Sequence, residues 1–390
     1  MTPTASTYRV ASIDILRGLI MIIMALDHTR DFFHITAMTA DPLDAATTTP
    51  VLFFTRFITH YCAPGFVFLS GLSAWLSSRK KTKAEAGAFL MKRGAWLVVA
   101  EVTLVTLGLT FNPFFNFIIL QVIWAIGWSM IVLGLLMRIS YKVVLWAGIL
   151  LVLGHNILDY SSPPANGTLA YLVGTLFTTR GLFLPLDGTH TIGIFYAILP
   201  WTGLMLLGYC MGVWFQKDFP AKKRQRLLLI TGTVATLLFI VLRLARGYGD
   251  PGTWDGNTLY SFLNTSKYPP SLQFSCMTIG PSLILLSLLE YIRAGWTRVV
   301  SVYGRVPFFY YILHFYLLHT LLVIVFFASN HTVDQISEPQ SPFLFRPSQF
   351  GYPLWVVYLI WISVVAILYL PCRWYNKYKS QHTQWWLKYI

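Results

Sequence analysis

Charged residues are scarce in this sequence. Asp, Glu, Lys and Arg make up 11% of its 390 residues, 56% are hydrophobic, and the mean hydropathy is +0.60. A soluble domain carries about 25% charged residues. The composition therefore excludes an ordinary soluble domain and predicts a polytopic membrane protein.

Acidic residues are scarcer than basic ones, with 15 Asp and Glu against 29 Lys and Arg, which gives a net charge of +14. Such an excess can indicate a nucleic-acid partner. Here the basic residues instead gather in short segments between apolar runs, as in the cytoplasmic loops of membrane proteins. We therefore expect a lipid bilayer as the surrounding medium and no nucleic-acid partner.

Motifs for several function classes are also missing. The sequence has no P-loop, dinucleotide fingerprint, zinc-ligand spacing or Gly-x-Ser-x-Gly elbow. It lacks a basic region followed by a small-residue cleavage site, so the first apolar segment is expected to be retained. No metal site is predicted, because the histidines are not suitably spaced and the four cysteines are far apart in the chain. These cysteines are Cys62, Cys210, Cys276 and Cys372.

Long apolar runs, by contrast, are abundant. Windows of about 20 residues predict an all-α protein with ten membrane-spanning helices. If the N-terminus is cytoplasmic, the inner segments hold 21 of the 29 Lys and Arg residues, so both termini are predicted to be cytoplasmic. The predicted spans are 10–30, 55–77, 94–112, 116–137, 143–160, 191–214, 227–246, 272–293, 306–328 and 353–372.

The connections on the two sides of the membrane differ in length. The outer ones are long and rich in Gly, Pro, Asn and Thr, and long loops on one face often house recognition. We find no internal repeat and no separate soluble domain. We therefore predict one membrane domain, 1–390, with a cytoplasmic tail at 373–390. The long outer loops are 31–54, 160–190, 247–271 and 329–352.

The first span carries polar residues where a bilayer disfavours them. Asp14, Arg17, Asp27 and His28 lie within or at the ends of this span. Charges at membrane depth cost several kcal/mol unless they face a polar interior, so they are candidates for function. Arg17 and His28 are eleven residues apart, about three helical turns, and share a helix face with a separation of roughly 16 Å.

Each of these residues has two interpretations. His28, beside Asp27, can act as a general base near neutral pH, or it can anchor the helix at the interface. Arg17 can bind a phosphate or carboxylate, or it can simply pair with Asp14 three residues earlier.

The second span adds two candidates near its outer end. Arg56 and His60 are four residues apart and are expected to face the same side as His28. Pro64 is expected to kink the helix. The small residues Gly71 and Ser73 are expected to allow close packing, most simply against the first helix.

Four further residues come from later segments. Glu101 is a lone carboxyl in the third span, with Arg17 as its expected partner. Lys267 and Tyr268 precede two prolines and suit an anionic or sugar-like ligand, although both also anchor helices at interfaces. His314 lies within the ninth span, where it is either catalytic or a buried neutral histidine.

Several segments together carry a family resemblance. The spacing from Arg17 to His28 resembles the Arg-ten-residues-His signature of a large membrane acyltransferase superfamily that includes acyltransferase family three. The chain from about Arg9 to His319 resembles the bacterial branch related to heparan-α-glucosaminide N-acetyltransferase. The segments that carry this resemblance are SIDILRG, TRFITHYCAPGFVFLSG, ILPWTGLMLLGYCMG and KYPPSL.

The resemblance implies acyl transfer across a membrane, from a cytoplasmic acyl-CoA to a glycan on the far side. His28 would then be the base, and Arg17 would contact the donor or support the structure beneath it. Whether His28 works alone, with His60, or gives way to His60 stays open. So does the choice between direct transfer and an acyl-histidine.

We therefore predict a multi-pass enzyme of the inner (plasma) membrane. It would move an acyl group, most simply acetyl, from acyl-CoA to a hydroxyl or amine of an envelope saccharide, without a metal. The sequence does not indicate an oligomeric state. The alternatives are a secondary transporter of a small polar solute, since intramembrane charges are typical of both classes, and a non-catalytic partner of an envelope-synthesis complex.

Overall fold

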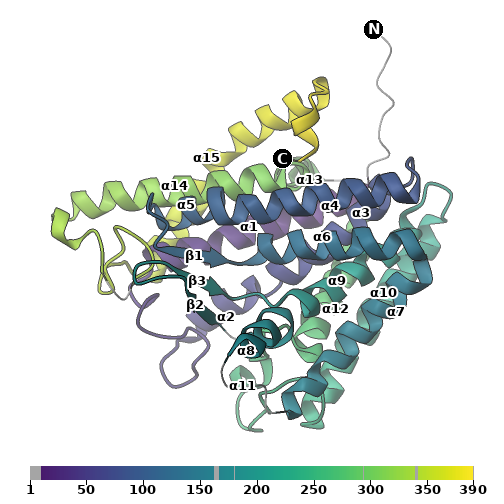
Figure 1. Ribbon diagram of the computed structural model, residues 1–390, viewed down its shortest axis with the longest axis horizontal. Coiled ribbons are helices and arrows are strands. Elements are labelled where there is room, and N and C mark those ends of the chain that lie inside the picture. The colour runs from purple at the N-terminus through teal and green to yellow at the C-terminus, as the bar shows by residue number, and fades with distance from the viewer. Residues whose placement is uncertain (1–9, 162–166, 180, 293, 339–340, 390) are drawn as a thin grey trace.

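A bundle of long helices dominates the computed structural model, which describes residues 10–161, 167–179, 181–292, 294–338 and 341–389. Figure 1 shows most of these helices side by side, some nearly parallel and others inclined to one another. The α-helices are α1 (Ala11–Phe33), α2 (Pro50–Thr59), α3 (Cys62–Ser78), α4 (Lys83–Ala100), α5 (Thr106–Thr110), α6 (Val122–Ile139), α7 (Tyr141–Gly154), α8 (Thr168–Val173), α9 (Ile198–Met211), α10 (Ala221–Leu244), α11 (Leu259–Leu263), α12 (Leu272–Leu289), α13 (Gly295–Arg305), α14 (Pro307–Ala328) and α15 (Leu354–Gln381).

Single turns of other helix types complete these elements. They are the π-helical turns η1 (Glu101–Val105) and η3 (Gly174–Thr178), and the 3₁₀ turns η2 (His155–Tyr160), η4 (Gly212–Phe215), η5 (Val333–Gln335) and η6 (Trp385–Lys388).

Eight helices of the described residues are long and apolar enough to cross a membrane. They correspond to eight of the ten predicted spans. The two others coincide with α1 and with the helical run 83–110, which both carry charged residues inside the apolar stretch. A mostly helical membrane protein is thus confirmed, whereas the number ten and the cytoplasmic position of both termini stay predictions.

The prediction of an all-α fold was wrong in one respect. Three short strands form a sheet in the order β1-β3-β2, in which β1 (Phe117–Leu120) runs parallel to β3 (Thr191–Ile194) and β2 (Leu182–Pro185) runs antiparallel to it. The spans predicted at 116–137 and 191–214 therefore begin as strands. Hydropathy does not distinguish a short buried strand from a turn of apolar helix.

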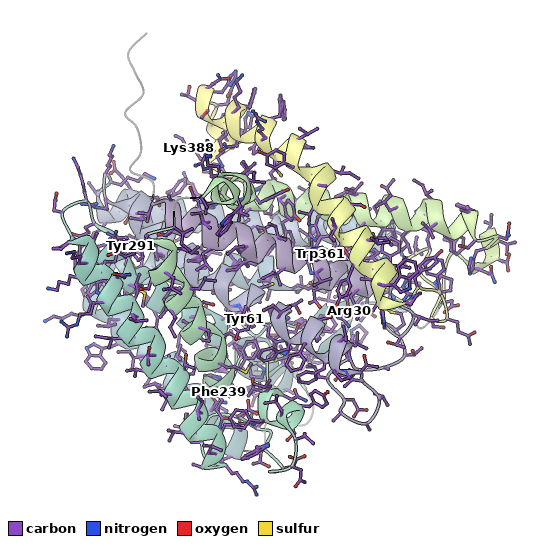
Figure 2. The ribbon with its side chains drawn as sticks, turned by 180° about the vertical axis from the view of Figure 1, so that it is seen from behind. Arg30, Tyr61, Phe239, Tyr291, Trp361 and Lys388 are labelled. Carbon is purple, nitrogen blue, oxygen red and sulfur yellow. The ribbon has the colours of Figure 1, made fainter. Side chains whose placement is uncertain are left out.

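The sheet closes one end of the bundle, beside α2 (Figure 1). The long loops predicted to be extracytoplasmic meet here, so we call it the outer end. Figure 2 shows Arg30 towards this end and Tyr291 and Lys388 towards the opposite one. We call the opposite one the inner end.

Helix α1 contacts α2, α3, α12, α13, α14 and α15. Its approach to α13 is especially close, because a Cβ atom on Gly304 would lie 1.9 Å from the Asp14 carbonyl oxygen. The segment 293–305 was predicted to be a plain inner loop, yet most of it forms α13. Its apolar residues face one side of the helix, a period that a search for 20-residue apolar runs does not detect.

The second predicted span is broken between α2 and α3, at His60 and Tyr61, and Pro64 lies in the first turn of α3. The predicted interruption is thus present. Gly71, however, packs against α9 instead of α1, since a Cβ atom there would lie 2.0 Å from the Met205 carbonyl oxygen. Ser73 does contact α1, where its hydroxyl accepts a hydrogen bond from Arg17.

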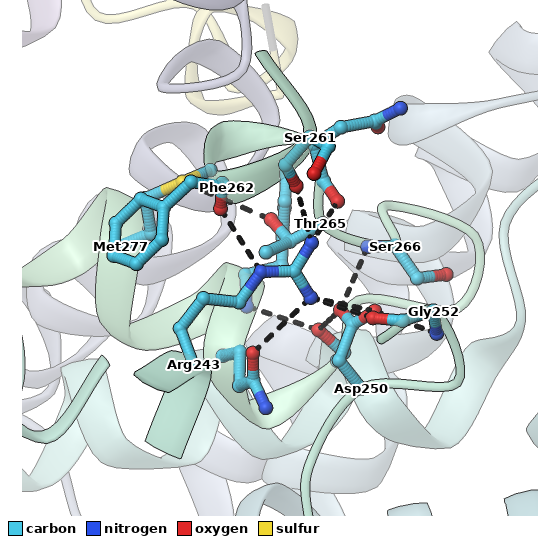
Figure 3. Close-up of polar contacts among 12 residues, drawn as sticks. Arg243, Asp250, Gly252, Ser261, Phe262, Thr265, Ser266 and Met277 are labelled. Atoms are coloured by element: carbon cyan, nitrogen blue, oxygen red, sulfur yellow. Dashed lines mark hydrogen bonds and ion pairs between the residues drawn. The ribbon is translucent and has the colours of Figure 1, made fainter. Parts of the chain in front are cut away.

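Two buried arginines fold the outer loops. Arg346 donates to the carbonyl oxygens of Pro347, Phe350 and His34, which ties the loop before α15 to the end of α1. Arg243 does the same for the loop between α10 and α12 (Figure 3). It donates to the carbonyl oxygens of Gly252, Ser261, Phe262 and Asn264 over distances of 2.5 to 2.9 Å.

Candidate active site

A pocket of about 210 Å³ opens at the outer end, and we call it the outer pocket. It is built from segments far apart in the chain. The end of α1, α2, the strand β1, the turn before α9, the loop before α12, the middle of α14 and the loop before α15 all contribute side chains. Its lining residues are Asp27, His28, Arg30, Asp31, Phe32, Arg56, Leu109, Phe117, Ile119, Gln121, Phe195, Tyr196, Lys267, Tyr268, Phe315, Pro342 and Phe343.

His28 is partly buried in this pocket and bonded to a second histidine. Its Nδ1 lies 2.6 Å from Nε2 of His314, and the two rings are stacked with centroids 4.9 Å apart. Phe315 stacks on His28 at 4.5 Å. Between two neutral imidazoles one nitrogen must donate and the other accept. If His28 donates from Nδ1, its Nε2 keeps a lone pair and can accept a proton.

Asp27 has partners other than His28. Its carboxyl accepts hydrogen bonds from Arg56 on α2 and from Arg30, the latter at 3.1 Å. Arg30 also donates to Asp31 at 2.6 Å. The four charges form a network that joins α2 to α1 beside His28. The sequence suggested that Asp27 orients the imidazole, whereas in the structure His314 holds that position.

Lys267 and Tyr268 reach the same pocket from the loop before α12. The Lys267 ammonium lies over the rings of Tyr268 and Tyr196, 5.1 and 5.9 Å from their centroids. Burial opposes ionisation of the Tyr268 phenol, but the charges of Lys267 and Arg56 outweigh burial, so its pKa lies below the ordinary value. A cation and a polarised phenol therefore face the pocket.

The loop position of these two residues is fixed from behind. Asp250 accepts hydrogen bonds from the Ser266 amide at 2.8 Å and the Ser271 hydroxyl at 2.6 Å, on either side of Lys267 and Tyr268. Asp250 itself lies 3.7 Å from Arg243, whose guanidinium stands at the centre of the contacts drawn in Figure 3. The outer pocket is thus held in part by a buried ion pair away from its lining.

His60 takes no part in the lining of the outer pocket. Its ring is 1% exposed, its Nδ1 lies 3.0 Å from the Arg56 carbonyl oxygen, and it packs against Phe274. Arg56 and His60 were expected to face the same way, but the first lines the pocket and the second lies behind it.

A second cavity, the inner pocket, lies deeper along the same face of α1 and is narrow, at about 70 Å³. It is mostly apolar, with two arginines at one side and a tyrosine at another. Its lining residues are Arg17, Met21, Phe66, Ser70, Arg93, Leu97, Val122, Ile123, Ile126, Met130, Pro307, Phe308 and Tyr311.

Arg17 joins three helices at this pocket. It donates to the Gly304 carbonyl oxygen of α13 at 2.9 Å and to Ser73 of α3 at 2.7 Å, and it lies 3.4 Å from Asp14. Asp14 also pairs with Arg305 at 3.5 Å. Arg17 therefore pairs with Asp14 and also lines a pocket, whereas its binding of a phosphate or carboxylate stays a prediction.

Glu101 lies between the two pockets and is fully buried. Among the described residues its partner is not Arg17, as expected, but the amide of Gln121, which donates to Oε1 at 2.6 Å. That amide stands at the beginning of α6, where backbone N–H groups lack helical partners. The π-helical turn that begins at Glu101 turns this carboxyl towards α6, and such turns are frequent at functional sites.

Several lining residues escaped the sequence analysis. Arg93 was assigned to an inner loop, and Tyr196, Phe343 and Tyr311 were not singled out. The spacing of Tyr311 from His314 is one helical turn, so a shared helix face with a candidate histidine could have revealed it. Tyr196 and Phe343 belong to loops, for which no such period exists.

Comparison with protein families decides the class of this chain. The family model for heparan-alpha-glucosaminide N-acetyltransferase, catalytic, matches residues 9–243, more than half of the sequence. The chain belongs to this family. It is therefore an acetyl-CoA-dependent membrane acetyltransferase, as the resemblance implied, and the transporter and non-catalytic alternatives fall away. No curated protein matched the chain.

The matched residues include Arg17, His28, Arg56 and Glu101 but end before Lys267 and His314. The acetyltransferase class is thus supported on the first part of the chain, and the tertiary structure brings the second part to the same pocket. Among the described residues, no three His, Cys, Asp or Glu side chains stand close enough to hold a metal ion.

Proposed function

We propose that this acetyltransferase takes acetyl-CoA from the cytoplasmic side and acetylates an amine or hydroxyl of an envelope saccharide outside the inner membrane, with His28 as the base. One observation carries the proposal. His28 of the outer pocket lies against Tyr311 of the inner pocket, with ring centroids 6.3 Å apart, so that the proposed base stands between the two cavities.

The inner pocket suits the donor. Arg17 and Arg93 lie on the side nearer the inner end, and the rest of the lining is mostly apolar. An arginine fork suits phosphate, and an apolar passage suits a pantetheine arm. This arrangement orients the thioester towards His28, while the CoA phosphates stay near the inner surface.

The outer pocket suits a polar acceptor. Its charges are three cations (Arg30, Arg56 and Lys267) and two carboxylates (Asp27 and Asp31), and the Asp27 carboxylate already has two arginine partners. Aromatic rings complete the lining, as is common where a sugar ring packs on a protein. An acceptor amine or hydroxyl placed here would meet Nε2 of His28.

These positions define the steps of the acyl transfer. As the acceptor nitrogen or oxygen attacks the thioester carbon, His28 takes its proton on Nε2, the carbon–sulfur bond breaks and the CoA thiolate leaves. The proton passes from His28 to the thiolate, which restores the neutral imidazole. In the acyl-histidine route Nε2 itself attacks the thioester carbon and the CoA thiolate leaves. The acceptor then attacks the acyl carbon, the bond from this carbon to Nε2 breaks, and the proton of the acceptor passes to the thiolate. In both routes His28 carries a proton on Nδ1, from which it donates a hydrogen bond to Nε2 of His314.

The test uses the full chain in nanodiscs with radiolabelled acetyl-CoA and glucosamine or an envelope saccharide extract. His28→Ala should lower acetyl transfer by about 10²- to 10⁴-fold, the usual contribution of a general base. His314→Ala should lower it by about 10- to 100-fold, as loss of an orienting partner does. His60→Ala is the matched control, and transfer that is lost in this variant but kept in His28→Ala would overturn the assignment.

Release of CoA in the absence of acceptor separates the two routes. A burst of CoA equal to the enzyme concentration indicates an acyl-histidine, and its absence indicates direct transfer.

A further inference from the structure

Tyr311 is buried, yet its hydroxyl has no partner. The side chain is 3% exposed, and no hydrogen-bond partner for Oη lies among the described residues. A buried unsatisfied hydroxyl costs about 1 to 3 kcal/mol, so such groups are rare without a reason. A phenylalanine would fill the same space without this cost. The hydroxyls of Tyr310 and Tyr375 are also buried and unpartnered among the described residues, so it is the position of Tyr311 in the pocket lining that points to a ligand as the partner.

The place of this hydroxyl is informative. Tyr311 lines the inner pocket, whereas its helical neighbour Phe315 lines the outer pocket and His314 lies between them against His28. The Tyr311 ring stands edge-on to His28, with centroids 6.3 Å apart, and lies 5.4 Å from His314. It is therefore a lining residue of the donor side that contacts the proposed base.

Acyl transfer needs a second group besides a base. Negative charge develops on the thioester oxygen as the acceptor attacks, and a donor aimed at this oxygen stabilises it. The base contacts the nucleophile and the donor contacts the oxygen, each at about 3 Å from the atom it serves. A base and a hydrogen-bond donor that lie next to each other and both reach one acyl group satisfy this requirement.

Other polar groups of the inner pocket do not suit this task. Arg17 is bonded to Gly304 and Ser73 and lies about three helical turns before His28 on α1. Arg93 lies further towards the inner end, two helical turns before Glu101 on the same helical run. Glu101 does not line the inner pocket; its Oε1 accepts from the Gln121 amide, and its Oε2 has no partner among the described residues.

We infer that Tyr311 is a catalytic residue whose hydroxyl donates a hydrogen bond to the thioester oxygen of acetyl-CoA in the transition state. The inference rests on the proposed function of His28. The hydroxyl that stabilises the developing negative charge then comes from α14, and the base comes from α1. The two helices thus flank the reacting carbon. No proton is transferred from Tyr311, and no further reactant is needed.

The neighbouring residue offers a matched control. Tyr310 is also fully buried and its Oη also lacks a partner among the described residues, but it lines neither pocket. Its ring packs against Tyr303 and stacks on His314 with centroids 5.8 Å apart, and Tyr310→Phe keeps this ring in place. Tyr311→Phe and Tyr310→Phe remove the same atom from adjacent buried sites. Because neither hydroxyl has a partner in the described part of the chain, both variants should unfold at or slightly above the wild-type temperature.

The experiment measures steady-state kinetics of the full chain in nanodiscs at varied acetyl-CoA. Tyr311→Phe should lower kcat by about 10²- to 10³-fold, the cost of one such donor, with the KM for acetyl-CoA largely unchanged. Tyr310→Phe should keep the wild-type kcat. Equal kcat values in the two variants would overturn the inference, and so would a loss in Tyr311→Phe confined to KM.

Failure of the inference is separable from failure of the proposed function. If His28→Ala abolishes transfer while Tyr311→Phe matches Tyr310→Phe, only the role of Tyr311 is wrong. If the wild-type chain transfers no acetyl group to an amine or hydroxyl acceptor, the proposed function itself is wrong.

Discussion

At the scale of single residues, the charged network around Asp27 is what holds the candidate base in place. Asp27 and His28 are adjacent in sequence, but one accepts bonds from Arg56 and Arg30 while the other bonds to His314. The first interaction joins α1 to α2, and the second joins α1 to α14. Neighbouring residues thus fix the end of α1 from two sides.

This network predicts a non-additive response to mutation. Asp27→Asn or Arg56→Gln alone leaves a buried charge poorly paired and should destabilise the protein by about 3 to 5 kcal/mol. The double variant removes both charges and should cost less than the sum of the two. Thermal unfolding in one detergent checks this as a double-mutant cycle.

The control for the cycle is Asp41→Asn, in the exposed loop between α1 and α2, which should leave the unfolding temperature unchanged. Additive effects of Asp27→Asn and Arg56→Gln would contradict a direct pair.

At the scale of elements, the close approach of α1 and α13 positions the arginine of the inner pocket. Arg17 donates to the Gly304 carbonyl oxygen, and this is possible because Gly304 brings the α13 backbone against α1 at Asp14. The amphipathic helix α13 was not predicted, yet it supplies one of the bonds that orient Arg17. The donor binding proposed for Arg17 therefore depends on a packing contact outside the pocket.

Gly304→Ala should push the two helices apart. Its Cβ would lie 1.9 Å from the Asp14 carbonyl oxygen, and overpacking of this kind costs about 1 to 3 kcal/mol. We expect a lower unfolding temperature and a higher KM for acetyl-CoA, because Arg17 loses its hydrogen bond to the Gly304 carbonyl oxygen, one of the bonds that orient it. Both are measured on the full chain in nanodiscs.

Gly295→Ala is the matched control, since a Cβ at the beginning of α13 meets no atom within 4 Å. Equal KM values in the two glycine variants would show that α13 does not position Arg17.

At the scale of the whole molecule, the two pockets differ in their lining and so distinguish the inner end of the bundle from the outer end. The inner pocket holds Arg17 and Arg93, and the outer pocket holds His28 among residues of the long loops. The predicted excess of basic residues at the inner end would place these pockets on the cytoplasmic and extracytoplasmic sides. The direction of acetyl transfer depends on this orientation.

Labelling of single cysteines tests the orientation. Asn257 in the loop before α11 and Lys222 at the beginning of α10 are both exposed, whereas the four native cysteines are buried and should react little. In intact spheroplasts a membrane-impermeant maleimide should label Asn257→Cys and spare Lys222→Cys. After lysis both should react. The reverse pattern would invert the predicted topology.

The sequence by itself determined the membrane class, most of the spans, the acetyltransferase family and the shared face of Arg17 and His28. The membrane class, the spans and the shared face follow from apolar run length and helical period, which are local properties of the chain. The family follows from the resemblance of four sequence segments to known members. The strands at the beginning of two predicted spans were missed, and so was the amphipathic helix α13. Hydropathy records burial and not backbone geometry.

Only the tertiary structure decided which candidates meet. His28 and His314 are 286 residues apart and bond directly, whereas His60, closer in sequence, is turned away behind Arg56. Lys267 reaches the pocket because the Arg243–Asp250 pair folds its loop. Such contacts arise from helix packing and loop closure across the whole bundle, and no local pattern in the sequence encodes them.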